Sequence, residues 1–198
     1  MPQALGSVPE VLADLAKALR SLRVRWYLFG AQALVLRGLS RATAHVDVTV
    51  LLGTIPTERL LAMLRRHGLP PAIEEARFVA TTRVVPVVHR RTGLLVDIVL
   101  GGPGIEERFA AAAETVRVGR IRVPVATATH LVVMKVLAGR PKDLDDAAGL
   151  LAMSVGRIDA DELDELSQAL SRALADDGVL DNLREVRRRS ARLRGRRA

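Results

Sequence analysis

The chain has 198 residues and a mass of 21.4 kDa, which is enough for one ordinary domain with a small appendage and too little for two catalytic domains. Apolar residues make up 49% and charged residues 26% of the sequence, a balance that excludes wholesale disorder and low-complexity architectures. Because cysteine is absent, a disulfide scaffold, a cysteine nucleophile and a zinc finger are excluded as well. Only five aromatic residues occur, so extensive stacking of single-stranded bases on aromatic rings is not expected.

The net charge of +8 comes almost entirely from the C-terminus. Residues 184–198 hold eight arginines against Glu185, whereas the preceding residues carry 22 basic and 21 acidic groups. A basic tail of this kind suits RNA, DNA or another polyanion, and a solvated C-terminal helix explains it equally well. Arginine outnumbers lysine 27 to 3, which indicates a genomic composition bias, so the arginine content alone does not indicate function.

The N-terminal residues lack the basic and apolar regions of a signal peptide. The longest apolar stretch, Leu131–Ala138, is interrupted by Lys135 and is far shorter than the roughly 18 residues that a membrane span needs. We therefore expect a cytoplasmic protein with no membrane partner.

Hydrophobic periodicity predicts an α/β core followed by helices. A helix is predicted over Pro9–Leu22, then a strand at Trp26–Phe29, a turn at Gly30 and a helix from Ala31 to Leu36. Between residues 45 and 126 the pattern predicts one helix, Thr57–His67, and strands at Val46–Leu52, Arg77–Ala80, Val84–Val88, Leu94–Leu100, Val116–Val118 and Ile121–Val125. From Thr127 onward the pattern is helical, with breaks near residues 139–141, 156 and 178.

Two of the predicted strands carry carboxylates, which are unusual inside a sheet because an uncompensated buried charge costs several kcal/mol. In Val46–Leu52, side chains alternate, so His45 and Asp47 share the face opposite Val46 and Val48. In Leu94–Leu100, Asp97 lies opposite Val96 and Ile98. If the two strands pair, Asp97 completes a three-ligand metal site with His45 and Asp47; the alternative is that each acid ends a strand or pairs with an arginine.

Three further features point to phosphate binding, and each also has a purely structural explanation. Gly30 lets backbone N–H groups at a helix start approach a phosphate, although glycine ends strands in most α/β folds. Lys135 either extends to the surface from its helix or presents its ammonium group to a phosphate. The run from Gly139 to Asp146 offers several charged groups, but a helix end at Gly139 and a helix start at Pro141 explain them too.

Taken together, these segments resemble the minimal nucleotidyltransferases of the DNA polymerase β-like superfamily. The likeness rests on Gly30-Ala31-Gln32, on the segment from Arg41 to Asp47 (RATAHVD), on Thr82-Arg83-Val84, on Leu95–Val99 (LVDIV) and on Val133–Asp146 (VMKVLAGRPKDLDD). Within the superfamily, the chain is most similar to the AbiEii/AbiGii-type toxins of type IV toxin–antitoxin systems. The resemblance covers about residues 24–152. It implies an α/β nucleotidyltransferase fold, with a mixed β-sheet flanked by helices in residues 1–125, a helical part in 126–183 that completes the cleft, and an Arg-rich tail in 184–198.

The resemblance also implies roles for individual residues, and NTP as the substrate. Asp47 and Asp97 match metal-binding and catalytic carboxylates that hold Mg²⁺ or Mn²⁺, and Lys135 matches a lysine that contacts the nucleotide phosphates. Contacts to phosphate, or positions beside the site, are implied for Gly30, Gln32, Arg41, Thr43, Lys142, Asp143 and Asp146. The implied reaction transfers a nucleoside monophosphate to an acceptor hydroxyl and releases pyrophosphate; the implied partners are RNA, plausibly tRNA, and a cognate antitoxin.

His45 departs from the family pattern, because it stands where the family has its first metal-binding aspartate. A neutral imidazole removes one negative charge and replaces a hard oxygen ligand by nitrogen, which disfavours Mg²⁺ and suits Mn²⁺ or Zn²⁺ better. Ala31, in place of a second Gly or Ser, is a milder departure. Two alternatives therefore stay open beside a toxin-like enzyme: transfer to a small molecule, and a catalytically inactive module that binds a nucleotide or a regulatory partner.

Overall fold

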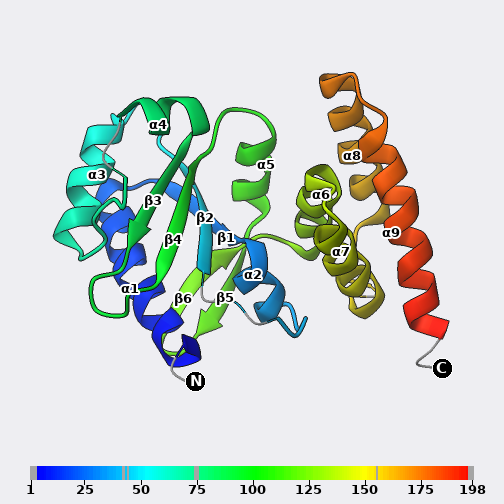
Figure 1. Cartoon of the computed structure of the whole chain (residues 1–198), viewed down its shortest axis with the longest axis horizontal. Coiled ribbons are helices and arrows are strands. Elements are labelled where there is room, and N and C mark those ends of the chain that lie inside the picture. The colour runs from blue at the N-terminus through cyan, green and yellow to red at the C-terminus, as the bar shows by residue number, and fades with distance from the viewer. Residues whose placement is uncertain (1–3, 42, 44, 74–75, 155, 196–198) are drawn as a thin grey trace. The chain divides into compact units, whose positions relative to one another are not determined.

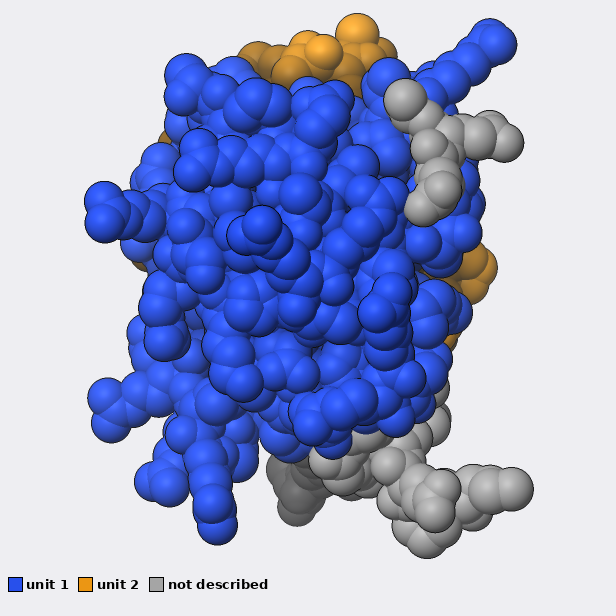
Figure 2. Space-filling model, turned by 90° about the vertical axis from the view of Figure 1, so that its left-hand side faces the viewer, with its two compact units in different colours: residues 1–33, 42–126 blue, residues 34–41, 127–198 orange. Residues whose placement is uncertain are grey.

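The structure is a computed structural model that describes residues 4–41, 43, 45–73, 76–154 and 156–195. The chain divides into two compact units. Unit 1 consists of Met1–Ala33 and Ala42–Ala126, and unit 2 of Leu34–Arg41 and Thr127–Ala198 (Figure 2). The short helix α2 (Gly30–Leu36) begins in unit 1 and ends in unit 2.

Unit 1 is built on a six-stranded mixed sheet (Figure 1). The strand order is β3-β4-β2-β1-β6-β5, where the strands are β1 (Arg25–Phe29), β2 (His45–Leu51), β3 (Val84–Val88), β4 (Leu95–Leu100), β5 (Glu114–Val118) and β6 (Ile121–Val125). The β2–β4 and β1–β6 pairs are parallel and the other three pairs are antiparallel. The predicted α/β class with a mixed sheet is therefore confirmed. The antiparallel strands β5 and β6 form a hairpin that turns at Gly119-Arg120.

Helices cover both faces of this sheet. Alternate residues of β2 and β4, including Val46, Val48 and Ile98, are completely buried on one face. Two helices, α1 (Ala4–Leu22) and α3 (Thr57–Arg66), pack against each other and contribute leucines to this core. On the opposite face, α5 (Ile105–Ala112) packs against β1 and β2.

The contact of α5 with the sheet is aromatic. The ring of Phe109 meets that of Tyr27 edge-on, with ring centroids 6.4 Å apart. Tyr27 lies opposite Thr49 in the β1–β2 pair, so this contact covers one end of the sheet face that carries Asp47. Burial is the main reason why the pKa of Tyr27 rises to about 12.

Two elements of unit 1 differ from the sequence predictions. The segment predicted as a strand at Arg77–Ala80 is helix α4 (Ala76–Thr82), so that prediction is wrong. The segment is only partly buried and pairs with none of the described strands; instead, the N–H group of Arg83 donates to the Val79 carbonyl and closes the helix. Three apolar residues in a row, Phe78, Val79 and Ala80, do not distinguish a period of 2 from one of 3.6. Helix α5 was not predicted, although Glu107 accepts a hydrogen bond from the Gly104 N–H group, a local sign of a helix start.

Unit 2 contains helices α6 (Ala128–Ala138), α7 (Pro141–Met153), α8 (Ala160–Leu174) and α9 (Gly178–Gly195). Helix α6 packs against the other three helices, and α7 packs against α9. Gly139, with φ of +66°, ends α6 in the left-handed conformation and Pro141 opens α7. The predicted helical pattern and its breaks near residues 139–141 and 178 are confirmed. No helix among the described residues is long and apolar enough to span a membrane.

The arginines predicted as a tail belong largely to α9. Val186 and Ser190 of this helix are buried, so residues 184–195 pack as a continuation of the preceding turns. Arg187 pairs with Asp164 of α8, and Arg189 pairs with Asp145 of α7. Residues 196–198, with the last two arginines, lie outside the described part of the chain.

Candidate functional site

The sheet of unit 1 brings His45, Asp47 and Asp97 together. Strands β2 and β4 pair in parallel with Asp47 directly opposite Asp97, as the predicted pairing requires. The His45 Nε2 atom lies 2.8 Å from Asp97 Oδ2 and 3.6 Å from Asp47 Oδ1. One ligand atom from each of the three residues lies within 4.8 Å of the others. The three side chains are thus close enough to hold one divalent cation.

The strand pattern explains why these polar groups converge. Val46 and Val48 are fully buried on one face of β2, so His45 and Asp47 must point to the other face. The same alternation in β4 buries Val96 and Ile98 and turns Asp97 toward that second face. The three side chains are between a quarter and two-fifths exposed, which leaves them accessible to a ligand from solution.

Gly30 lies directly beside the Asp47 carboxylate. A Cβ atom at Gly30 would lie 2.1 Å from Asp47 Oδ2 and 2.7 Å from Asp47 Cγ, closer than real Cβ contacts come. Gly30 also has a φ of +67°, which favours glycine. Both the positive φ and the close contact with Asp47 therefore require glycine at this position. The Asp47 carboxylate occupies the space that a side chain would need. The predicted contact of Gly30 with phosphate stays a prediction.

Gln32 and Thr43 shape the chain that leads into β2. The buried Gln32 donates from Nε2 to the Thr43 carbonyl oxygen over 3.3 Å. The Thr43 hydroxyl oxygen accepts a hydrogen bond from the His45 N–H group over 3.2 Å. These bonds support His45 from its N-terminal side. The roles predicted for Gln32 and Thr43 toward phosphate stay predictions.

A second cluster of charged side chains lies in unit 2. Lys135 of α6 places its Nζ atom 2.5 Å from Asp143 Oδ1 and 3.3 Å from Asp146 Oδ2, both on α7. Asp143 also pairs with Arg140 at 2.5 Å, and Asp146 pairs with Arg41 at 3.1 Å. Both carboxylates are almost completely buried, so the cations offset their desolvation. The cluster gives four of the predicted site residues partners within unit 2.

This cluster changes the ionisation of Asp143. Burial by itself raises the pKa of a carboxyl group, but the hydrogen bonds from Lys135 and Arg140 outweigh it and hold the pKa of Asp143 below its ordinary value. Asp143 also lies in the first turn of α7, where a negative charge is favourable. The helix end at Gly139 and the helix start at Pro141 are thus both present, and Asp143 also forms an ion pair with Lys135. The nucleotide contacts predicted for this run stay predictions. Lys142 is exposed and has no partner among the described residues.

The donor set of the unit 1 cluster fits a divalent cation. Two carboxylates and one imidazole supply oxygen and nitrogen ligands, a mixture that suits Mn²⁺ or Zn²⁺ better than Mg²⁺. The Asp47 carboxylate packs so closely against the backbone at Gly30 that any side chain there would clash with it. This close packing holds one of the ligand residues in place and is a second sign of a built site. The convergence of the three side chains and the close packing of Asp47 against Gly30 together support a site for one cation bound by His45, Asp47 and Asp97.

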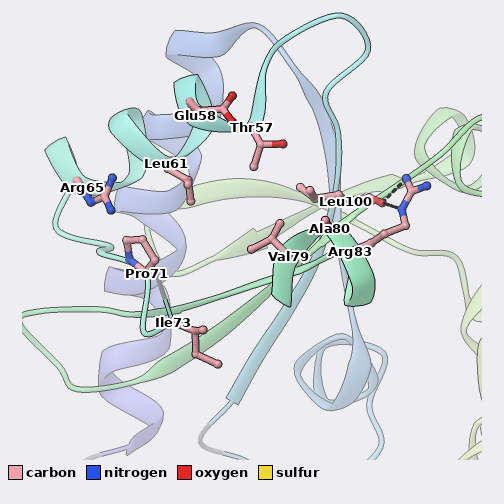
Figure 3. A pocket seen from close by; sticks show the side chains of 10 residues that line it. All are labelled: Thr57, Glu58, Leu61, Arg65, Pro71, Ile73, Val79, Ala80, Arg83 and Leu100. Carbon is pink, nitrogen blue, oxygen red and sulfur yellow. Dashed lines mark hydrogen bonds between the residues drawn. The ribbon is translucent and has the colours of Figure 1, made fainter. Parts of the chain in front are cut away.

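Unit 1 also contains a cavity of about 560 Å³ that the sequence did not predict (Figure 3). Its lining is mainly apolar and comes from α3, α4, the loop between them and the end of β4. None of the predicted site residues lines it. Leu100 contributes to this cavity and, by strand alternation, points away from the face that carries Asp97. At its rim, Arg83 donates from Nε and Nη2 to the Leu100 carbonyl oxygen.

No protein-family model matches the chain, and no curated protein sequence matches it. Several solved structures have a similar fold. The solution structure of the antibiotic-resistance factor ANT(2'')-Ia matches with a TM-score of 0.59 at 12% identity, over 86% of this chain and 94% of that chain. An antigenic nucleotidyltransferase-like protein from Paracoccidioides brasiliensis matches with a TM-score of 0.58 at 17% identity, over 88% and 92% of the two chains.

A crystal structure of ANT(2'')-Ia in complex with adenylyl-2''-tobramycin matches with a TM-score of 0.56 at 14% identity, over 84% of this chain and 98% of that one. At these identities the likeness establishes a shared fold. The predicted nucleotidyltransferase fold is therefore confirmed, and the AbiEii/AbiGii-type assignment remains an expectation.

The contact between Gly30 and Asp47 predicts the effect of adding one methyl group. We expect Gly30→Ala to lower the free energy of unfolding by about 2–4 kcal/mol, since it combines a left-handed backbone penalty with a steric clash. Gly53→Ala is the matched control, because Gly53 has a similar φ of +58° but nothing within 4 Å of the added Cβ atom. Urea unfolding of both variants measures the difference; equal losses would show that the clash with Asp47 is absent.

The lowered pKa of Asp143 predicts a dependence on pH. Its ionised form contributes stability above the ordinary pKa of 3.8, and that contribution is lost as the pH falls through the lower pKa of the folded state. We therefore expect Asp143→Asn to be less stable than the unmodified chain by roughly 1–3 kcal/mol at pH 7, and by progressively less below pH 3.8.

Denaturant unfolding at a series of pH values measures this difference. Asp145→Asn is the control on the same helix, because Asp145 is 71% exposed and its removal should change the free energy of unfolding by less than about 1 kcal/mol. A loss at Asp143 that does not shrink on acidification would contradict the ion-pair explanation.

Proposed function

We propose that the chain is a metal-dependent nucleotidyltransferase, which transfers a nucleoside monophosphate from NTP to an acceptor hydroxyl and releases pyrophosphate. The observation that carries the proposal is the convergence of His45, Asp47 and Asp97 on one face of a sheet with a nucleotidyltransferase fold. The solved structures with this fold include an antibiotic-resistance factor in complex with adenylyl-2''-tobramycin.

In this proposal His45, Asp47 and Asp97 hold the cation. When bound, a divalent cation neutralises the charge of the triphosphate and favours ionisation of the attacking hydroxyl. Gly30 keeps the Asp47 carboxylate against the backbone, and Thr43 supports His45 through its N–H group. Both contacts reduce the movement of the ligand residues before substrate binds.

The chemistry balances as an in-line displacement. The acceptor oxygen forms a bond to the α-phosphorus, and the bond from that phosphorus to the bridging oxygen of pyrophosphate breaks. Asp97 is proposed to accept the proton of the acceptor hydroxyl, since it is the more exposed of the two carboxylates, at 38%. The roles of Lys135, Lys142, Arg41, Asp143 and Asp146 in nucleotide binding are proposed from the motif resemblance alone.

Two kinds of acceptor follow from different observations. The motif resemblance to AbiEii/AbiGii-type toxins favours RNA such as tRNA as acceptor, with a cognate antitoxin as partner. The antibiotic complex of a protein with the same fold favours a small molecule with free hydroxyl groups. Both acceptors require the same transfer chemistry at the unit 1 cluster.

A non-catalytic nucleotide-binding module is the alternative from another class, and His45 favours it. The His45 Nε2 atom already lies at hydrogen-bond distance from Asp97, so in the absence of a cation the two side chains satisfy each other. An imidazole also supplies no negative charge to the cation. Loss of one metal carboxylate costs several powers of ten in rate when it carries much of the transition-state stabilisation.

The transfer assay separates these functions. Labelled NTPs are incubated with total tRNA or with tobramycin, in Mg²⁺ or in Mn²⁺. We expect label transfer in Mn²⁺, at least about tenfold less in Mg²⁺, and a rise of the Mg²⁺ rate in His45→Asp because the variant restores an oxygen ligand.

Asp97→Asn is the matched variant within the same cluster, and it should lower transfer at least about a hundredfold with either cation. Circular dichroism checks that each variant is folded. Full activity of Asp97→Asn, or transfer by neither the unmodified chain nor His45→Asp with any cation and acceptor, would contradict the proposal.

A further inference from the structure

A basic cavity lies on unit 1, away from the residues assigned above. Its volume is about 290 Å³, and it lies between α1 and the β5–β6 hairpin. The residues that line it are Ala13, Ala16, Lys17, Arg20, Arg120, Ile121 and Arg122. All four cationic residues are exposed, and no acidic residue lines the cavity.

Most of this positive charge is not neutralised. Lys17 pairs with Asp14, three residues earlier on α1. Arg20, Arg120 and Arg122 make no ion pair with any residue that the structure describes. An exposed guanidinium group without an acidic partner keeps its full charge toward solution.

The same hairpin carries a fourth guanidinium group, that of Arg117, which does not line the cavity. Arg117 lies directly opposite Arg122 in the β5–β6 pair, so the two side chains emerge on the same face of the hairpin. Arg117 donates from Nε to the Gly119 carbonyl oxygen, which is a neutral acceptor. Like charges at directly opposed positions destabilise a strand pair. A bound anion would relieve this repulsion.

The arginines of α9 provide a contrast. Arg184, Arg187 and Arg188 pair with Asp181, Asp164 and Glu185 respectively. Although the C-terminal segment holds more arginines, these three charges are already compensated by acidic side chains of unit 2. For residues 184–198 the sequence left polyanion binding and a solvated helix equally open. The cations that line the present cavity lie instead on α1 and the hairpin.

The residues that line the basic cavity indicate which kind of ligand it can bind. Arginine binds phosphate oxygens through two parallel N–H groups, and successive phosphates of a duplex match several separated guanidinium groups. No aromatic residue lines the cavity, so bases have no ring to stack on there. Membrane surfaces need apolar anchors beside the basic residues, and none of the exposed large apolar residues is at this cavity; they are Ile73, Leu95, Leu137, Met153, Leu174 and Leu193.

We propose that α1 and the β5–β6 hairpin bind the phosphate backbone of a nucleic-acid duplex, through Arg20, Arg120 and Arg122, without reading its sequence. The proposal does not depend on nucleotidyl transfer, because it concerns binding without NTP or metal. If transfer to RNA occurs, the same surface would hold the double-helical part of the acceptor.

Fluorescence anisotropy with a labelled duplex of about 20 base pairs, measured over a range of salt concentrations, tests the proposal. Each neutralised phosphate contributes about 0.9 to the slope of log K against log salt. We expect the triple variant R20Q/R120Q/R122Q to reduce this slope by about 2–3 and to weaken binding at least about tenfold at low salt.

The matched control is R184Q/R187Q/R188Q, which removes the same net charge from paired arginines of α9. We expect its slope to stay within about 1 of that of the unmodified chain. Circular dichroism verifies folding, and the single variant R120Q, at the tip of the hairpin, should reduce the slope by about 1 if the triple variant is unstable.

Three results would overturn the proposal. The unmodified chain could fail to bind duplex at low salt. Both triple variants could lose binding equally, which would show that binding depends on the net charge of the chain and not on these particular arginines. Finally, phosphatidylserine vesicles could bind through these arginines while the duplex does not, which would assign the surface to a membrane.

Discussion

The site depends on one electrostatic constraint, which is that two carboxylates stand directly opposite each other on neighbouring parallel strands. Asp47 and Asp97 are in register on β2 and β4, and both are more than half shielded from solvent. Like charges opposite each other in a sheet are unfavourable unless a cation lies between them. His45, two residues before Asp47, reaches both carboxylates and supplies a partner that is cationic only when it is protonated. A divalent cation satisfies the same constraint with more charge, and this is why the cluster supports a metal site.

The backbone around the cluster is adapted to this constraint. Gly30 ends β1 and begins α2 with a left-handed φ, and its missing side chain is the space in which the Asp47 carboxylate lies. In unit 2 the buried acids Asp143 and Asp146 are compensated by fixed cations instead, namely Lys135, Arg140 and Arg41. The two clusters thus solve the same desolvation problem in different ways. Unit 2 compensates its buried acids with lysine and arginine side chains, whereas the acids of unit 1 contact His45 and are exposed enough to reach a ligand from solution.

Strand alternation made the unit 1 cluster predictable from the sequence. His45, Asp47 and Asp97 stand where a buried strand should be apolar, and period-two alternation fixes the face to which each points. That the two strands lie next to each other was an assumption, supported by the motif resemblance. The structure confirms that they pair. Other features depend on contacts between distant segments, which spacing does not encode. The pairing of Arg41 with Asp146 and the packing of residues 184–195 into α9 are of this kind. The short segment Arg77–Ala80 was mistaken for a strand because its few apolar residues fit either period.

We expect Asp47 and Asp97 to bind one divalent cation together with His45. Titration of the chain with Mn²⁺, followed by the loss of the free-ion electron paramagnetic resonance signal, measures this binding without any substrate. One Mn²⁺ should bind per chain, with at least about tenfold weaker binding in Asp97→Asn and unchanged binding in Asp161→Asn, whose exposed carboxylate lies at the start of α8. Equal Mn²⁺ affinity in the unmodified chain and in Asp97→Asn would contradict a cation site at these three residues.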